Sequence, residues 1–215
     1  MHIQRFLDLI FSTLAIALLS PILLIIVLIL SVTGEREVFY RQQRVGINQA
    51  SFNLLKFATM LKNSENIGAG TVTLKNDSRV LPIGKFLRKT KLNELPQLFN
   101  IMLGHMSIIG PRPLHNKQFS FYNESQKKII SSVVPGLSGM GSVVFRDEEK
   151  YFQDSNDPDE AYKKHITPVK ARLEIWYVNN NSIYLYFKLI ALTVISVLIP
   201  STVATNFFGD ELDET

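Results

Sequence analysis

Cysteine is absent from the 215 residues, so neither disulfides nor thiolate metal sites are available to this protein. The four histidines, His2, His105, His115 and His165, lie far apart and lack the spacing of zinc ligands. Hydrophobic residues make up 46% and charged residues 20% of the chain. These values exclude gross disorder and fit one globular domain, or one domain and a membrane segment. The absence of cysteine fits a reducing compartment.

Charge is unevenly distributed along the chain, although the net charge is only +4. Residues 36–91 hold eleven Lys or Arg against three Asp or Glu, whereas residues 145–160 and 210–215 are acidic. The basic segment predicts contact with a pyrophosphate or with anionic lipid head groups, and a solvated surface is the alternative. The basic side chains in question are Lys56, Arg79, Lys85, Arg88, Lys89 and Lys91.

A long stretch near the N-terminus has no charge at all, from Leu9 to Gly34. Its apolar centre, residues 14–30, is long enough as a helix to cross about 30 Å of hydrocarbon. It is too long for a signal peptide and has no cleavage site of small residues, so a membrane helix is expected. The alternative is the buried helix of a soluble protein.

Ser20 and Pro21 lie in the middle of this apolar stretch. Proline removes a backbone donor and bends a helix, and the Ser20 hydroxyl can bond a carbonyl one turn back. Arg5 precedes the stretch, and three arginines follow it between residues 36 and 44. Because positive residues favour the cytoplasmic side, two positive flanks predict a kinked, re-entrant helix rather than a span.

The rest of the chain predicts a small α/β domain, mostly helical with short strands. Extended segments are expected at 38–45 and 51–57, with a turn at 47–50 and a loop at 64–77. Helices are expected at 83–91, at 93–103 with Asn93 as its N-cap, and at 119–131, 159–179 and 183–203. The predicted units are 1–34 as membrane helix, 35–205 as an interfacial cytosolic domain and 206–215 as an acidic tail.

Two short motifs carry potential chemistry. In Gly110-Pro111-Arg112-Pro113, the prolines restrict the backbone of Arg112, which suits bidentate phosphate recognition. In the second motif, residues 93–98, Glu94 near a helix start could hold Mg²⁺. Each motif has a structural alternative, a proline-rich turn in the first case and ordinary helix capping in the second.

The order of motifs resembles the bacterial sugar transferase family, the monotopic polyprenyl-phosphate phosphoglycosyl transferases. The resemblance covers nearly the whole chain, and the order of its elements is specific although no single element is. The matching phrases are Arg5-Phe-Leu-Asp8 before Ser20-Pro21, residues 38–46 and 52–60, Asn76-Asp-Ser-Arg79, Gly84-Lys-Phe-Leu-Arg88, residues 92–100, residues 104–113, and Pro135-Gly-Leu-Ser-Gly139.

The resemblance implies a phosphoglycosyl transferase at the cytoplasmic face of the bacterial inner membrane. Such an enzyme moves sugar-1-phosphate from a UDP-sugar to undecaprenyl phosphate, with Mg²⁺, and releases UMP in the first membrane step of surface glycan synthesis. The expected partners are the two substrates, membrane lipids, and another copy or a related transferase, but no nucleic acid. Substrate contacts are expected at Lys56, Thr59, Arg79, Arg88, Pro111, Arg112 and Arg146, with Glu94 on the metal.

The chain departs from the family at the position of the catalytic nucleophile. Family members have an Asp that attacks the β-phosphate and forms a phosphosugar-enzyme intermediate, and here that position is Asn93. Ala58 and His105 also differ from the usual Arg and Asp. Three explanations are open: Asp147 or Glu148 supplies the nucleophile, Glu94 supports direct transfer, or the chain is an inactive membrane-bound partner of an active transferase.

Overall fold

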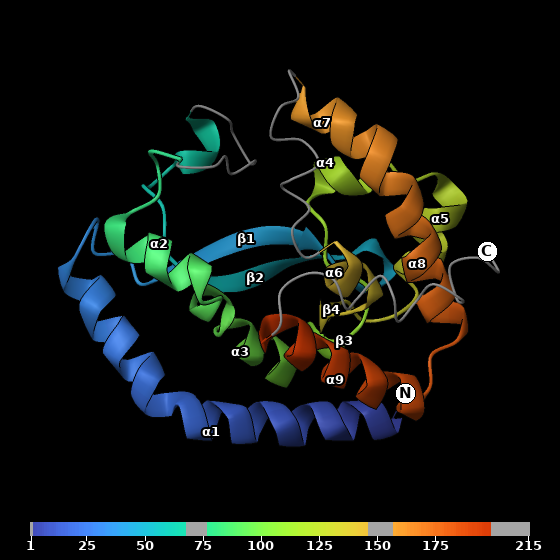
Figure 1. Ribbon diagram of the computed structural model, residues 1–215, viewed down its shortest axis with the longest axis horizontal. Coiled ribbons are helices and arrows are strands. Elements are labelled where there is room, and N and C mark those ends of the chain that lie inside the picture. Colours follow the sequence, from blue (N-terminus) through green and yellow to red (C-terminus); the bar gives the residue numbers. More distant parts are fainter. Residues whose placement is uncertain (1, 68–76, 146–156, 199–215) are drawn as a thin grey trace.

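The computed structural model describes residues 2–67, 77–145 and 157–198, which form a mostly helical structure with short strands (Figure 1). The helices are α1 (His2–Val32), α2 (Pro82–Lys89), α3 (Gln97–Met102), α4 (Asn116–Phe119), α5 (Glu124–Ile130), α6 (Met140–Val144), α7 (Pro158–Ala161), α8 (Thr167–Asn179) and α9 (Ile183–Leu198). Short 3-10 turns are η1 (Ile47–Gln49), η2 (Ser64–Asn66) and η3 (Leu92–Glu94), and η5 (Tyr162–Ile166) is a π-helix. The strands are β1 (Phe39–Val45), β2 (Ser51–Phe57), β3 (Ser107–Ile109) and β4 (Gly136–Ser138).

Helix α1 is long and bent. Figure 1 shows it running along the base of the molecule and then turning upward, and Pro21 lies inside it. The Ser20 hydroxyl donates to the carbonyl of Ala17 at 2.8 Å, as the sequence predicts for a bend beside proline. By length and composition α1 could cross a membrane, with a mean hydropathy of 3.0, and Leu18 is 80% exposed.

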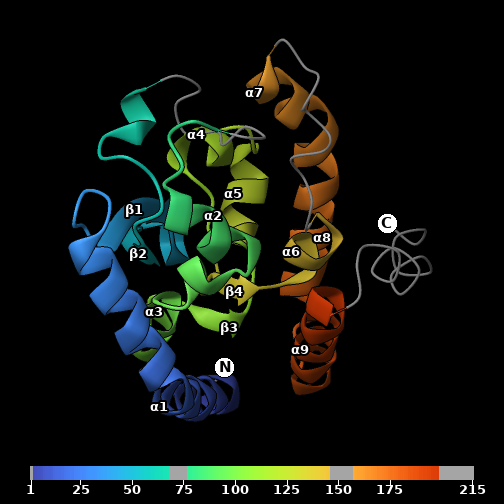
Figure 2. The same cartoon turned by 60° about the vertical axis from the view of Figure 1, so that its left-hand side comes forward.

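Polar side chains fasten the N-terminal half of α1 to the domain. Asp8 is 2% exposed and accepts hydrogen bonds from the backbone N–H of Ile108 at 3.0 Å and the hydroxyl of Tyr186 at 2.9 Å. Arg5 donates to the carbonyls of Ile101 and Met102. These contacts join α1 to α3, β3 and α9, so the apolar helix and the domain are one packed unit. In Figure 2, α8 and α9 lie on the right, while β1, β2 and the ascending half of α1 lie on the left.

Strands β1 and β2 form the hairpin that the sequence predicts. They pair antiparallel from Phe39 opposite Phe57 to Val45 opposite Ser51. The connecting turn is η1, where Asn48 has a positive φ of 52°, a conformation that Asn tolerates well. Phe57 is buried with Leu30 of α1 and Leu87 of α2, so the hairpin ties the second half of α1 to the domain.

A second, parallel pair of strands was not predicted. Strands β3 and β4 pair at Ser107 with Gly136 and at Ile109 with Ser138. The glycines around this pair pack backbone against backbone: a Cβ at Gly136 would overlap the amide nitrogen of Gly110, and one at Gly139 would overlap its carbonyl oxygen. The pair therefore places the Gly-Pro-Arg-Pro turn directly beside the Pro-Gly-Leu-Ser-Gly segment.

Three helix predictions need correction or refinement. The helix expected at 119–131 is present as α5, but its predicted start is wrong, because α4 ends at Phe119 and Asn123 caps α5 with a reciprocal capping box to Gln126. The helix expected at 159–179 contains the π-helix η5 between α7 and α8. The helix expected from residue 183 is α9, described as far as Leu198, and the predicted acidic tail lies outside the described residues.

Candidate functional site

A carboxylate and several basic side chains from different parts of the chain meet around Glu94. Glu94 ends η3 and is half-buried, and the Gln97 amide of α3 donates to its Oε2 at 3.2 Å. Burial alone would raise the pKa of the Glu94 carboxyl, but Arg112, Lys56, Lys91 and the Gln97 bond outweigh it and hold the pKa below its usual value. Glu94 is therefore ionised at neutral pH.

Lys56, on β2, is the basic partner with the most altered environment. Desolvation, against the opposing effect of Glu94 and together with the positive charges of Arg44, Arg112 and Arg88, lowers the pKa of its ammonium to about 7. Arg44, Arg88 and Arg112 all act on Lys56 against the single carboxylate of Glu94, so positive charge is in excess around Lys56. Such a site attracts anions with more than one negative charge, and phosphate groups are the natural candidates.

The donor set around Glu94 fits a magnesium ion only if the substrate contributes ligands. The described residues contain no group of three or more His, Asp or Glu side chains that could hold a metal ion. Mg²⁺ is commonly bound by one or two carboxylates together with substrate phosphates and water. One ionised carboxylate beside phosphate-attracting cations suits that mode of binding.

Asn93 does not cap a helix, so the predicted N-cap is wrong. It lies inside the 3-10 turn η3, which begins after Lys91 with a φ of 59°, and Pro96 rather than Asn93 immediately precedes α3. Its side chain is 7% exposed, and its Oδ1 has no hydrogen-bond partner among the described residues. A buried acceptor without a donor is uncommon and costly, which points to a site completed by a ligand.

Thr59 and Arg88 belong to two segments that meet in a close contact between α2 and the chain after β2. A Cβ at Gly84 in α2 would overlap the carbonyl oxygen of Thr59, and the Leu81 N–H donates to that same oxygen at 3.0 Å. Glycine is thus required for α2 to approach so closely. The contact positions Arg88, near the end of α2, where its charge acts on Lys56.

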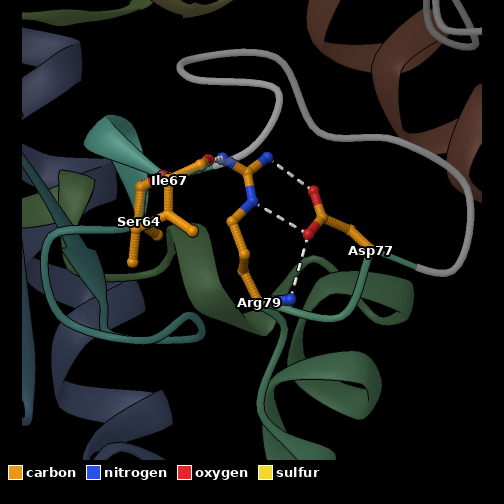
Figure 3. A network of polar contacts seen from close by, with 4 residues as sticks. All are labelled: Ser64, Ile67, Asp77 and Arg79. Carbon is orange, nitrogen blue, oxygen red and sulfur yellow. Dashed lines mark hydrogen bonds and ion pairs between the residues drawn. The ribbon is translucent and has the colours of Figure 1, made fainter.

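Arg79 occupies a different environment from the other predicted contacts. Its guanidinium forms an ion pair with Asp77, with Nη2 to Oδ2 at 2.6 Å and Nε to Oδ1 at 2.9 Å, and Nη1 donates to the carbonyls of Ser64 and Ile67 (Figure 3). The side chains of Arg79 and Asp77 are each 5% exposed. Substrate binding by Arg79 stays a prediction, but its geometry indicates that it holds the 64–67 and 77–79 segments together.

Replacement of Arg79 by Leu should therefore act on stability. Removing one member of a buried ion pair strands the other, so we expect the free energy of unfolding to fall by about 3 kcal/mol. Thermal unfolding followed by circular dichroism measures this, with Lys62→Gln as control, because the Lys62–Glu37 pair is exposed and should matter little. An unchanged unfolding midpoint combined with lost turnover would instead assign Arg79 to substrate binding.

The remaining predicted residues divide into two groups. Pro111 is buried and Arg112 half-buried in the turn after β3, and the charge of Arg112 reaches both Glu94 and Lys56. Arg146 and Asp147 lie outside the described residues, as does Glu148. The sequence alone did not indicate the contribution of Gln97 or of Glu174, a buried acid on α8 that contacts the Arg112 backbone.

An ionised carboxylate among basic side chains, on a small domain that carries a long apolar helix, is an arrangement suited to phosphate-bearing ligands. Comparison of the sequence is more specific. The family model for bacterial sugar transferases matches residues 1–200, and the chain belongs to that family.

Relatives of known activity are identical to the chain at about a third of the aligned positions. It is 35% identical, over 90% of its length, to a UDP-glucose:undecaprenyl-phosphate glucose-1-phosphate transferase of Klebsiella pneumoniae. It is 32% identical, over 91% of its length, to a UDP-N-acetylgalactosamine-undecaprenyl-phosphate N-acetylgalactosaminephosphotransferase of Aeromonas hydrophila. The chain spans only 40% and 44% of those two proteins, but 89% of an uncharacterised sugar transferase, EpsL, of Bacillus subtilis, to which it is 30% identical over 93% of its length.

Proposed function

We propose that the chain transfers a sugar-1-phosphate from a UDP-sugar to undecaprenyl phosphate and releases UMP, at the cytoplasmic face of a bacterial inner membrane. The observation that carries this proposal is the meeting of Glu94, Lys56 and Arg112 in one site. The relatives of known activity support the two substrates, and the alignments with them cover about 90% of the chain.

Each residue has a role that follows from its charge and position. Arg112 and Lys56 bind and orient the diphosphate of the UDP-sugar, and the guanidinium can grip two phosphate oxygens at once. Glu94, together with the diphosphate, would hold Mg²⁺, which neutralises charge that develops on the phosphate oxygens when it is bound. Overall, an oxygen of the lipid phosphate forms a bond to the β-phosphorus of the UDP-sugar, the bond from that phosphorus to the bridging oxygen breaks, and UMP leaves with the bridging oxygen.

The residue at position 93 bears on whether the transfer takes one step or two. An amide is a very poor acceptor for a phosphoryl group, so Asn93 offers no covalent intermediate. In the proposed route the lipid phosphate attacks the β-phosphate directly while Lys56 and Arg112 hold both anions close together. Attack by an acid such as Asp147 or Glu148 is the alternative route, and it requires an adduct on the protein.

The experiment that tests the function is UMP release by the full chain in lipid nanodiscs. Undecaprenyl phosphate, Mg²⁺ and a panel of UDP-sugars are supplied, and each product is identified by mass. Release of UMP that depends on the lipid phosphate supports the proposal and names the sugar. No release with any UDP-sugar would contradict it and favour a non-catalytic role beside an active transferase.

The lowered pKa of Lys56 predicts a pH-dependent affinity. Bound phosphate favours the charged ammonium, so affinity falls as free Lys56 loses its proton, and KM for the UDP-sugar should rise as pH increases through about 7. Lys56→Arg keeps its charge throughout this range and should flatten the profile. Initial rates between pH 6 and pH 9 measure the effect, and parallel profiles for both proteins would assign the titration to another group.

The membrane topology that we propose is a re-entrant helix. It is supported by the bend of α1, by Pro21 and Ser20, and by large apolar side chains that α1 leaves exposed, such as Leu14 and Leu28. A helix whose two ends both carry positive flanks satisfies the cytoplasmic preference of Arg only if both ends stay on that side.

Labelling of single cysteines tests the topology without background, because the chain has no cysteine of its own. Ile3→Cys and Glu37→Cys mark the two sides of the apolar stretch. A membrane-impermeant maleimide should label neither in intact cells and both after permeabilisation. Pro21→Ala restores the missing N–H and should favour a straight span. Labelling of either end from the periplasm in the otherwise unchanged protein would rule out the hairpin.

A further inference from the structure

Two hydrogen bonds hold the peptide unit between Pro111 and Arg112: the Pro111 carbonyl accepts from the Gly136 N–H at 2.8 Å, and the Arg112 N–H donates to α8. In the turn formed by residues 110–113, the two prolines have no N–H, so Gly110 and Arg112 supply the only backbone donors. Gly110 donates to the carbonyl of Ser138 at 2.9 Å, which continues the β3–β4 pair. The Arg112 N–H has a different partner: it donates to Oε1 of Glu174 at 3.3 Å, across 62 positions of sequence.

Glu174 is an acid placed where an acid is expensive. It lies on α8, is 2% exposed, and its Oε2 has no hydrogen-bond partner among the described residues. Gly141 of α6 leaves space for it, because a Cβ at that position would overlap Oε1. A buried carboxyl with so few partners lowers the stability of the fold. Its presence at this position therefore points to a role other than stability.

The space beside this contact is too small for substrate. Pro111, Arg112, Glu174 and Tyr122 are among the residues that line a cavity of about 20 Å³, which is room for about one water molecule. Glu174 therefore acts on the site through Arg112 rather than through contact with a sugar or a base.

We propose that Glu174 is a positioning residue, which holds the backbone of Arg112 so that its guanidinium stays where its charge acts on Glu94 and Lys56. The inference rests on the proposed function, since it assigns the role of a distant helix in the same phosphate site. It also explains why α8 has a buried acid at this point. The Arg112 N–H, between the two prolines, has the Glu174 carboxyl as its acceptor in place of a backbone carbonyl.

The protonation of Glu174 does not remove the anchor. Burial raises the pKa of its carboxyl to about 7, against the Arg112 N–H bond and the charges of Lys170 and Arg112. Lys170, one turn earlier on α8, is itself 1% exposed and donates to the Tyr162 hydroxyl at 3.2 Å. Both the charged and the neutral carboxyl keep an oxygen that can accept from the Arg112 N–H, so Gln is a conservative replacement.

Hydrogen exchange measures the anchor directly. Since neither proline has an amide hydrogen, fragmentation of a peptide that includes residues 110–114 isolates the exchange of Arg112. In the full chain in nanodiscs, Glu174→Ala should greatly speed that exchange, and Glu174→Gln should keep it slow. Equal exchange in Glu174→Ala and the unchanged protein would overturn the proposal, whether or not the chain releases UMP.

Kinetics then separate positioning from a general effect on folding. Partial unfolding lowers the active fraction and so lowers kcat at constant KM, whereas a misplaced Arg112 weakens phosphate binding. We expect Glu174→Ala to raise KM for the UDP-sugar about tenfold or more, and Glu174→Gln to restore it. A lower kcat at unchanged KM would overturn the positioning role. If the unchanged protein releases no UMP, the proposed function fails, and the exchange result still decides the anchor.

Gly141 provides a second variant that leaves the carboxylate in place. Gly141→Ala should push Oε1 away from the Arg112 N–H, speed its exchange and raise KM. In the Glu174→Ala background the added methyl group meets no carboxylate, so it should have little further effect. Independent, additive effects of the two changes on the exchange of Arg112 would contradict the proposed link.

Discussion

Glu94→Gln is expected to abolish turnover while the protein stays folded. The amide has nearly the same shape as the carboxylate but lacks its charge, so it cannot hold Mg²⁺ together with the diphosphate. It also removes the carboxylate that opposes the other charges on Lys56 and that interacts with Arg112 and Lys91. We expect the rate of UMP release to fall by about 10³-fold, comparable to the loss of a main electrostatic contact in other active sites.

The matched control for this change is Glu124→Gln. Glu124 is a carboxylate at the start of α5 with an 86% exposed side chain, paired only with Lys127 among the described contacts of its carboxylate. Its loss should leave turnover unchanged. Glu94→Gln should stay folded, because Gln97 can still bond the new side chain. Circular dichroism and the unfolding midpoint test this. Full activity of Glu94→Gln would move the chemistry to the acids at 147–149.

The sequence predicts best those elements whose signal is local and strong. The β1–β2 hairpin follows from two extended segments joined by Ile47–Gln49, and α1 follows from an uncharged stretch too long for any other structure. A bend in α1 is expected from Ser20 and Pro21, because a proline inside a helix removes a backbone hydrogen bond and kinks the helix.

The β3–β4 pair could not be predicted in the same way. Each strand has three residues, too few for an alternating pattern, and their pairing depends on contacts among Gly110, Gly136 and Gly139. Those glycines belong to two phrases that the family resemblance had already singled out. Their close packing gives a physical reason for the order of the motifs.

The error at Asn93 has a different cause. Asn is a common N-cap, and Pro96 is common in a first helical turn, so local preferences favoured a helix from residue 93. The structure instead forms a 3-10 turn after the left-handed Lys91, and this buries Asn93 beside the charged site. Glu174 could not be found at all, because its link to Arg112 joins residues that no local pattern connects.

Asn93→Asp is expected to create a covalent phosphosugar intermediate at position 93. Oδ1 of Asn93 is buried without a hydrogen-bond partner among the described residues, and Asn93 is next in sequence to Glu94, on which several basic side chains act. A carboxylate there would be ionised by the same positive charges that lower the pKa of Glu94, and an ionised carboxylate can attack a phosphate. With UDP-sugar and Mg²⁺ but no lipid phosphate, the variant should form a phosphosugar adduct, visible by intact mass, and release at most one UMP per chain.

Two further variants separate this outcome from a change in packing. Asn93→Ala leaves a small buried space and no nucleophile, so it should form no adduct. The double change of Asn93→Asp with Glu94→Gln keeps the nucleophile but removes the proposed metal ligand, and its adduct should form at least about 10²-fold more slowly. An adduct on the unchanged protein would show that another acid already performs the attack. If Asn93→Asp folds and binds UDP-sugar but stays unmodified, then Oδ1 does not face the β-phosphate, and direct attack by the lipid phosphate becomes the route that the geometry of the site must explain.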